Sequence, residues 1–138
     1  MDMSQAFGSL NWLAIFGAAI SAFLLGGAWY SKGLFGNAWM KACGFTEADL
    51  QQGNMGKVFG VSFLLALFAA FNLAMFIGPQ ADAAYGAIAG FLAGIGWVAT
   101  MIGIHYLFER KSLAHFLINA GYSTVALTIM GVILGAWR

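Results

Sequence analysis

The sequence has very little charge. Only 8% of its 138 residues are Asp, Glu, Lys or Arg, whereas about a quarter of an ordinary soluble domain is charged. Hydrophobic residues make up 62%, and six basic and five acidic side chains are too few to cover a soluble protein of this size. We therefore expect most of the protein surface to face lipid rather than water, and membrane lipids are the first expected partner. A formal net charge of +1 also argues against a nucleic-acid surface.

Cysteine and the usual catalytic motifs are scarce as well. One cysteine, Cys43, excludes an internal disulfide and any metal site built from several cysteines. The order of Ser, His and Asp typical of hydrolases is missing, as are the Walker loop, the dinucleotide fingerprint and the zincin pattern. We therefore do not expect catalysis, and we predict no cofactor.

What the chain does have is long apolar stretches. A membrane-spanning helix needs about 20 predominantly apolar residues, and four stretches reach that length. The sequence therefore predicts one all-α domain over residues 1–138, a bundle of four transmembrane helices. The expected helices cover residues 10–30, 58–77, 83–108 and 113–137. Residues 1–9 contain no Lys or Arg, so we expect the first helix to be retained rather than removed as a signal peptide.

The basic residues predict how the bundle is oriented. Five of the six fall in or beside the links that follow the first and third helices, and only Arg138 lies at the other end. Cytoplasmic loops carry an excess of Lys and Arg. We therefore expect both termini on the non-cytoplasmic side of the membrane.

The link over residues 31–56 is the longest polar segment. Thr46 precedes Glu47 and Asp49, an arrangement typical of a helix start with acids in its first turn. We expect a short helix to about Gln52, ended by Gly53 and Asn54. The apolar residues just before it suit a segment lying in the headgroup plane. The link is interpreted either as a plain interfacial connection or as a gate or docking element.

The third apolar stretch carries glycines at a helical spacing. Gly86, Gly90 and Gly94 are four residues apart, so they share one face of a helix and form a smooth groove. In lipid, such a groove lets a second helix pack closely. These three glycines are therefore predicted to be helix-packing residues.

The four expected helices contain no Asp, Glu, Lys or Arg at depth, which argues against an exporter driven by exchange of a proton or cation. Neutral polar groups remain. His115, Asn119 and Tyr122 form one stripe on the fourth helix, and Asn72 lies deep within the second. The stripe, met across the bundle by Asn72, is interpreted either as interhelical hydrogen bonds or as the lining of a pore or solute pocket.

The two histidines allow a further interpretation. His105 and Glu109 are four residues apart on the third helix, and His115 follows the short turn at a similar expected depth. His105, Glu109 and His115 approach a metal site of two nitrogens and one carboxylate, or a proton relay. The alternative is that each histidine is an amphipathic side chain at the membrane interface.

Several short motifs in the first fifty residues carry a resemblance to a known family. The motifs are Asn11-Trp12, Trp29-Tyr30-Ser31, Leu34-Phe35-Gly36, Trp39-Met40-Lys41 and Gly44-Phe45-Thr46. The chain resembles, over nearly its whole length, the small bacterial membrane proteins grouped as domain of unknown function 1761. The resemblance implies a four-helix protein of the bacterial inner (cytoplasmic) membrane and supplies no activity or functional residues.

Three functions follow as hypotheses. The first is a non-enzymatic membrane protein that acts by association, as a homo-oligomer or as an accessory subunit of a membrane-protein complex. The second is an oligomeric channel or facilitator for a small solute or ion, lined by the polar residues of the fourth helix. The third is a metal-dependent activity at His105, Glu109 and His115.

Overall fold

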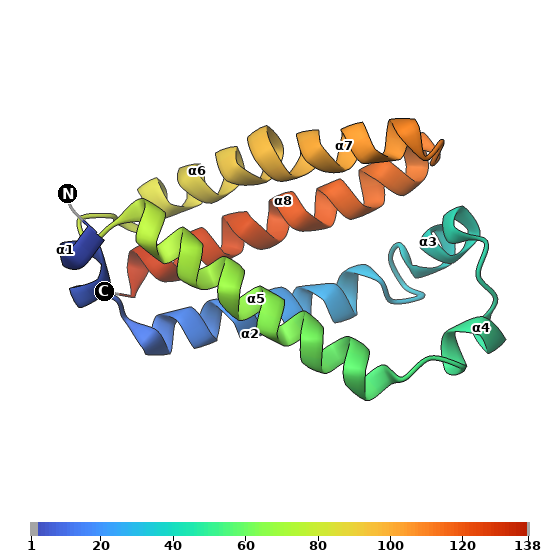
Figure 1. The fold of residues 1–138 in the computed structure, drawn as a ribbon, viewed down its shortest axis with the longest axis horizontal. Coiled ribbons are helices and arrows are strands. Elements are labelled where there is room, and N and C mark those ends of the chain that lie inside the picture. Colours follow the sequence, from blue (N-terminus) through green and yellow to red (C-terminus); the bar gives the residue numbers. More distant parts are fainter. Residues whose placement is uncertain (1–2, 138) are drawn as a thin grey trace.

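The computed structural model describes residues 3–137, and within them every regular element is a helix (Figure 1). Four helical segments are long and apolar enough to cross a membrane. They are α2 (Trp12–Trp29), α5 (Met55–Ile77), the segment Ala83–Phe108, and α8 (Leu113–Ala136). The expected all-α membrane fold is confirmed, and the expected ends of the four helices differ from those observed by at most three residues.

Each of the four spans begins with a side chain that accepts a hydrogen bond from the first turn. The distances from acceptor oxygen to backbone nitrogen are 3.1 Å for Asn11, 3.0 Å for Asn54, 2.8 Å for Asp82 and 3.0 Å for Ser112. Short polar side chains at this position satisfy amides that have no partner within the helix. Polar residues between the apolar stretches therefore define where each span begins.

Three short helices complete the described part of the chain: α1 (Met3–Gly8), α3 (Gly36–Cys43) and α4 (Glu47–Gln51). The expected start of α4 is confirmed as a reciprocal capping box between Thr46 and Asp49. The Thr46 hydroxyl accepts from the Asp49 amide at 3.2 Å, and the Thr46 amide donates to the Asp49 carboxylate at 2.8 Å. These hydrogen bonds lower the pKa of Asp49, so the carboxylate stays ionised.

Helix α3 is held against the end of α2 by a close backbone approach. A Cβ atom at Gly36 would lie 2.7 Å from the carbonyl oxygen of Ser31, so a larger residue does not fit there. At its other end α3 stops at Gly44, whose φ of 75° favours glycine. The segment expected in the headgroup plane is thus a helix with glycines at both ends.

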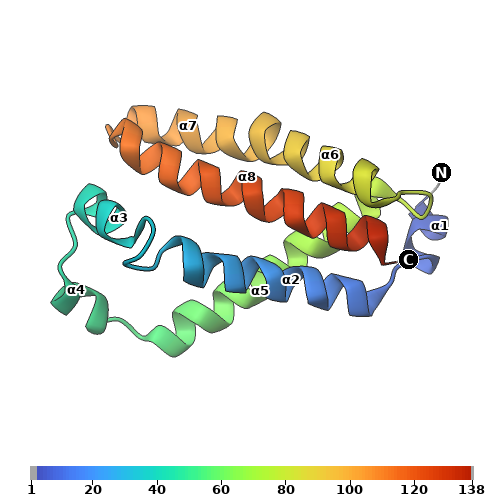
Figure 2. The same cartoon turned by 180° about the vertical axis from the view of Figure 1, so that it is seen from behind.

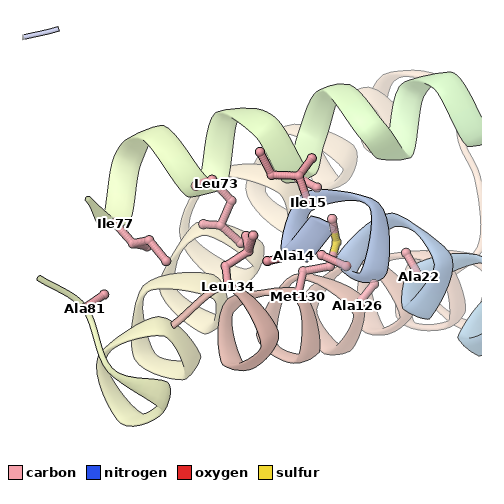
Figure 3. Close-up of a cluster of buried hydrophobic side chains, with 12 residues drawn as sticks. Ala14, Ile15, Ala22, Leu73, Ile77, Ala81, Ala126, Met130 and Leu134 are labelled. Atoms are coloured by element: carbon pink, nitrogen blue, oxygen red, sulfur yellow. The ribbon is translucent and has the colours of Figure 1, made fainter. Parts of the chain in front are cut away.

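The buried apolar core lies toward one end of the bundle. The buried core joins α2, α5 and α8 near the two termini (Figure 3). It consists largely of small and aliphatic residues, among them Ala14, Ile15, Ala18, Leu73, Ile77, Met130 and Leu134. Helix α5 runs obliquely, and its first half lies at the end opposite the termini, where α4 leads into it (Figures 1 and 2).

The third span is not a regular α-helix. Helix α6 (Ala83–Ala93) passes into a π-helical turn, η1 (Gly94–Val98), which continues as α7 (Ala99–Phe108). The Thr100 hydroxyl donates to the carbonyl oxygens of Gly96 at 2.8 Å and Trp97 at 2.9 Å. A π-turn contains one residue more than an α-turn. The residues that follow it are therefore rotated relative to a continuous α-helix.

Candidate functional site: the polar cluster of α2, α3, α7 and α8

The glycine groove of the third span is filled by α8 of the same chain. Gly86, Gly90 and Gly94 are buried, and a Cβ atom at Gly94 would lie 2.6 Å from the Cα of Thr124. At Gly86 and Gly90 an added Cβ would overlap the backbone of α8 at Gly131 and Leu127. The groove therefore packs α6 and α8 against each other within one chain.

At the other end of this hairpin, Asn119 links two tyrosines from different helices. Its amide oxygen accepts from the Tyr30 hydroxyl at 2.6 Å, and its amide nitrogen donates to the Tyr106 hydroxyl oxygen at 2.7 Å. Tyr30 follows α2 and Tyr106 lies on α7, so one side chain of α8 connects three spans. Both hydrogen bonds are part-buried. Shielding from water strengthens each bond and makes it costly for any of the three polar groups to lose its partner.

Two further hydrogen bonds tie α2 to α8. The Tyr122 hydroxyl donates to the Ala22 carbonyl oxygen at 2.8 Å, and the Trp29 indole donates to the Ile118 carbonyl oxygen at 3.0 Å. The rings of Tyr30 and Tyr122 lie 5.5 Å apart. The polar stripe of α8 therefore faces α2 and α7 inside the bundle.

His115 joins this cluster to α3. Its Nε2 lies 3.5 Å from the Cys43 Sγ, and its ring is 4.9 Å from that of Tyr106. The side chain is buried, and its Nδ1 has no hydrogen-bond partner among the described residues. Burial raises the pKa of the Cys43 thiol, and the nearby Lys111 ammonium opposes that shift. The pair therefore fixes the end of α3 to the start of α8 and keeps the thiol protonated at neutral pH.

Within the chain, Asn72 does not meet this stripe. Asn72 is exposed on α5, and its amide nitrogen donates to the Phe68 carbonyl oxygen of its own helix at 2.8 Å. The apolar face of α5 forms the core instead, through Leu73 and Ile77. Ala70, Leu73, Ala74 and Ile77 share one face of α5 at helical spacing, and Asn72 falls on the opposite face.

The three residues of the metal interpretation do not come together in the described part of the chain. His105 and Glu109 are exposed while His115 is buried, and among residues 3–137 no three His, Cys, Asp or Glu side chains are grouped so that they could hold a metal ion. In a continuous α-helix, eleven residues make about three turns, so His105 would share the face of Gly94. Because η1 contains one extra residue, Tyr106 lies on the face of Gly94 in place of His105. Tyr106 and not His105 therefore contacts α8.

Sequence reasoning missed several members of the cluster. The sequence did not place Tyr30, Tyr106 or Cys43 in this cluster. The positions of Tyr106 and Cys43 depend on the π-turn and on the docking of α3, for which a single sequence has no clear local signal. Hydrogen-bonding partners for Asn119 and Tyr122 were expected, but their identity required the tertiary structure.

The family model for proteins of unknown function DUF1761 matches residues 13–135. The chain belongs to the DUF1761 family. The match covers every member of the polar cluster and all of the four spans except their outermost residues, Trp12 and Ala136, and it confirms the resemblance noted from the first fifty residues. No curated protein and no solved structure matches the chain. As a DUF1761 protein it shares a family without an assigned activity, so its function has to be argued from its own geometry.

Proposed function

We propose that this DUF1761 protein is a non-enzymatic protein of the bacterial inner membrane that acts by self-association. The contact between copies is the first half of α5, not the groove of Gly86, Gly90 and Gly94 that first suggested association. That groove is already occupied by α8. A second copy needs a different close-packing face.

The observation that carries the proposal is one open pair of glycines. The sequence contains four pairs of glycines spaced four apart. Three of them, 86/90, 90/94 and 131/135, pack in the contact between α6 and α8. The fourth is Gly56 and Gly60 on α5. Around Gly60 no heavy atom of the described residues lies within 4 Å of an added Cβ, and around Gly56 the nearest is the Asn54 side chain at 3.5 Å.

The surroundings of this pair support the same contact. Large apolar side chains beside it on α5 are exposed, including Val58, Phe59, Val61 and Leu64. Small residues let two helices approach closely in lipid, and apolar neighbours then contribute dispersion contacts. The ring of Phe23 on α2 packs against those of Phe59 and Phe63, with a centroid distance of 5.8 Å in each pair. These contacts hold the first half of α5 against α2.

The experiment measures oligomers in mild detergent by native mass spectrometry and by crosslinking in membranes. Gly60→Leu should strongly reduce the oligomer fraction without unfolding the monomer, because the position is open. Gly27→Leu is the matched control, since Gly27 also lies in a span, is exposed and has no heavy atom of the described residues within 4 Å of an added Cβ. A wild-type protein that remains a lone monomer in both assays would overturn the proposal.

The channel hypothesis receives less support. Asn119 and Tyr122 hydrogen-bond to Tyr30, Tyr106 and the backbone of α2, so their polar atoms hold helices together. Channel activity nevertheless stays a prediction with its own test. Flux of small solutes into liposomes that falls on Asn119→Leu, measured under conditions where the variant stays folded, would favour it over association alone.

A further inference from the structure

A pocket of about 300 Å³ lies between the end of α2 and the helices α3 and α4. Its lining includes Tyr30, Lys32, Trp39, Met40, Glu47 and Gln51. The volume is at the lower limit of pockets that hold small molecules. Tyr30 directly follows the last residue of a span, so the pocket lies where the apolar part of the bundle ends, at the level expected for lipid headgroups.

One wall of the pocket is aromatic. The rings of Tyr30 and Trp39 lie 5.6 Å apart at an interplanar angle of 72°, and Phe45 lies 5.9 Å beyond Trp39. The hydroxyl of Tyr30 is held by Asn119, so this ring has a fixed position. The faces of Trp and Tyr rings attract organic cations, and such rings recognise alkylated ammonium groups in other proteins.

The rim of the pocket carries one charge of each sign. Lys32 and Glu47 form an ion pair, and their side chains are 69% and 59% exposed. The hydrogen bond from Lys32 lowers the pKa of Glu47, so its carboxylate is ionised at neutral pH. An ion pair this exposed contributes little to stability. A ligand can therefore replace it by offering a cation to Glu47 and an anion to Lys32.

We propose that this pocket binds a zwitterionic headgroup, an ammonium joined to a phosphate ester, carried by a membrane phospholipid. The ammonium lies against Glu47 and the Trp39 ring, and the phosphate lies against Lys32. The lining charges sum to zero, which favours a neutral zwitterion over an anionic lipid. Met40 and Leu50 add apolar surface to the same lining, next to which the first acyl carbons of a phospholipid can pack. A water-soluble phosphate ester has no acyl chain to pack against that surface, so we expect the ligand to be a membrane lipid.

The test uses the full-length protein in mild detergent, with native mass spectrometry of added phosphatidylethanolamine or phosphatidylglycerol. We expect one phosphatidylethanolamine to be retained in preference to phosphatidylglycerol. Glu47→Gln should weaken that retention by about tenfold, as expected for losing one charged contact worth about 1.4 kcal/mol. Glu109→Gln, which removes an exposed carboxylate between α7 and α8, is the control and should retain the lipid like the wild type.

Two results would contradict the proposal. Equal retention of both lipids, unchanged by Glu47→Gln, would overturn it. Displacement of the lipid by soluble phosphoethanolamine at the lipid's own concentration would overturn the membrane source while keeping the headgroup chemistry. Trp39→Leu gives a second variant that leaves the charges in place and should also weaken retention. The pocket shares no residue with Gly56 or Gly60, so lipid retention and oligomer formation succeed or fail separately.

Discussion

At the scale of single residues, the Asn119 side chain connects three spans of the bundle through two hydrogen bonds. It satisfies the hydroxyl groups of Tyr30 and Tyr106 at once, and these come from the end of α2 and from α7. Part-buried polar groups that lose their partner cost more than the hydrogen bond itself contributes. The stability of this end of the bundle therefore depends on a residue that could equally have lined a pore.

Asn119→Leu should destabilise the protein by about 1–3 kcal/mol, because it leaves two tyrosine hydroxyl groups without their partner. Unfolding in mixed micelles of increasing denaturing detergent would measure it. Tyr122→Phe is the comparison. It removes one hydrogen bond to a backbone carbonyl of α2, and an interhelical bond of this kind is worth about 0.6 kcal/mol. Equal stability of Asn119→Leu and the wild type would show that the tyrosines find other partners.

The Cys43 thiol offers a prediction about pH. Burial raises its pKa and Lys111 lowers it, so removing the ammonium in Lys111→Gln should raise the pKa further. The thiolate is the reactive form. Alkylation by iodoacetamide at a given neutral pH should therefore be slower in Lys111→Gln than in the wild type, and its pH profile should move to higher pH. Lys41→Gln, on α3 itself, is the control and should leave the profile in place.

At the scale of helices, the π-turn η1 decides which face of the third span meets α8. Before the turn that face carries Gly86, Gly90 and Gly94, and after it the face carries Ala99, Gly103 and Tyr106. Small residues continue along the contact only because one residue has been added. The same addition turns His105 outward. The turn therefore sets both the packing of the hairpin and the membership of the polar cluster.

Deleting Gly96 should convert η1 to a regular α-helix and rotate the following residues by about 100°. Disulfide crosslinking in a Cys43→Ser background can measure the rotation. With η1 intact, cysteines at positions 106 and 119 should crosslink and cysteines at 105 and 119 should not. After the deletion the preference should reverse. Continued crosslinking of 106 with 119 would show that the hairpin keeps its register without the extra residue.

At the scale of the whole molecule, charge and architecture divide the protein into two ends. Residues 31–54 and 109–112 connect spans at one end, and the two termini lie at the other (Figure 2). The Asn11 amide donates to the Trp137 carbonyl oxygen at 3.0 Å, which closes the end that carries the termini. The polar cluster and the proposed headgroup pocket both lie at the basic end. If that end faces the cytoplasm, the lipid contacted in the pocket belongs to the inner leaflet.

Topology reporters test this orientation directly. Alkaline phosphatase fused after residue 137 should be active in a bacterial host, since the enzyme folds only outside the cytoplasm. The same enzyme inserted after Gly53 should be inactive, because residues 31–54 are expected on the cytoplasmic side. A green fluorescent protein at each position is the control and should show the opposite pattern. Activity only at Gly53 would reverse the predicted orientation.

The sequence by itself determined the membrane class, the four spans, the helix α4 and the family. These depend on local properties, namely apolar length, capping side chains and short motifs, which act on neighbouring residues and need no partner elsewhere in the chain. The tertiary structure alone decided which glycines pack against another helix, that Asn72 faces outward, and that Cys43 reaches His115. Each of these depends on the rotation of one helix against another. A single added residue in η1 changes such a rotation without altering the composition from which the spans were predicted.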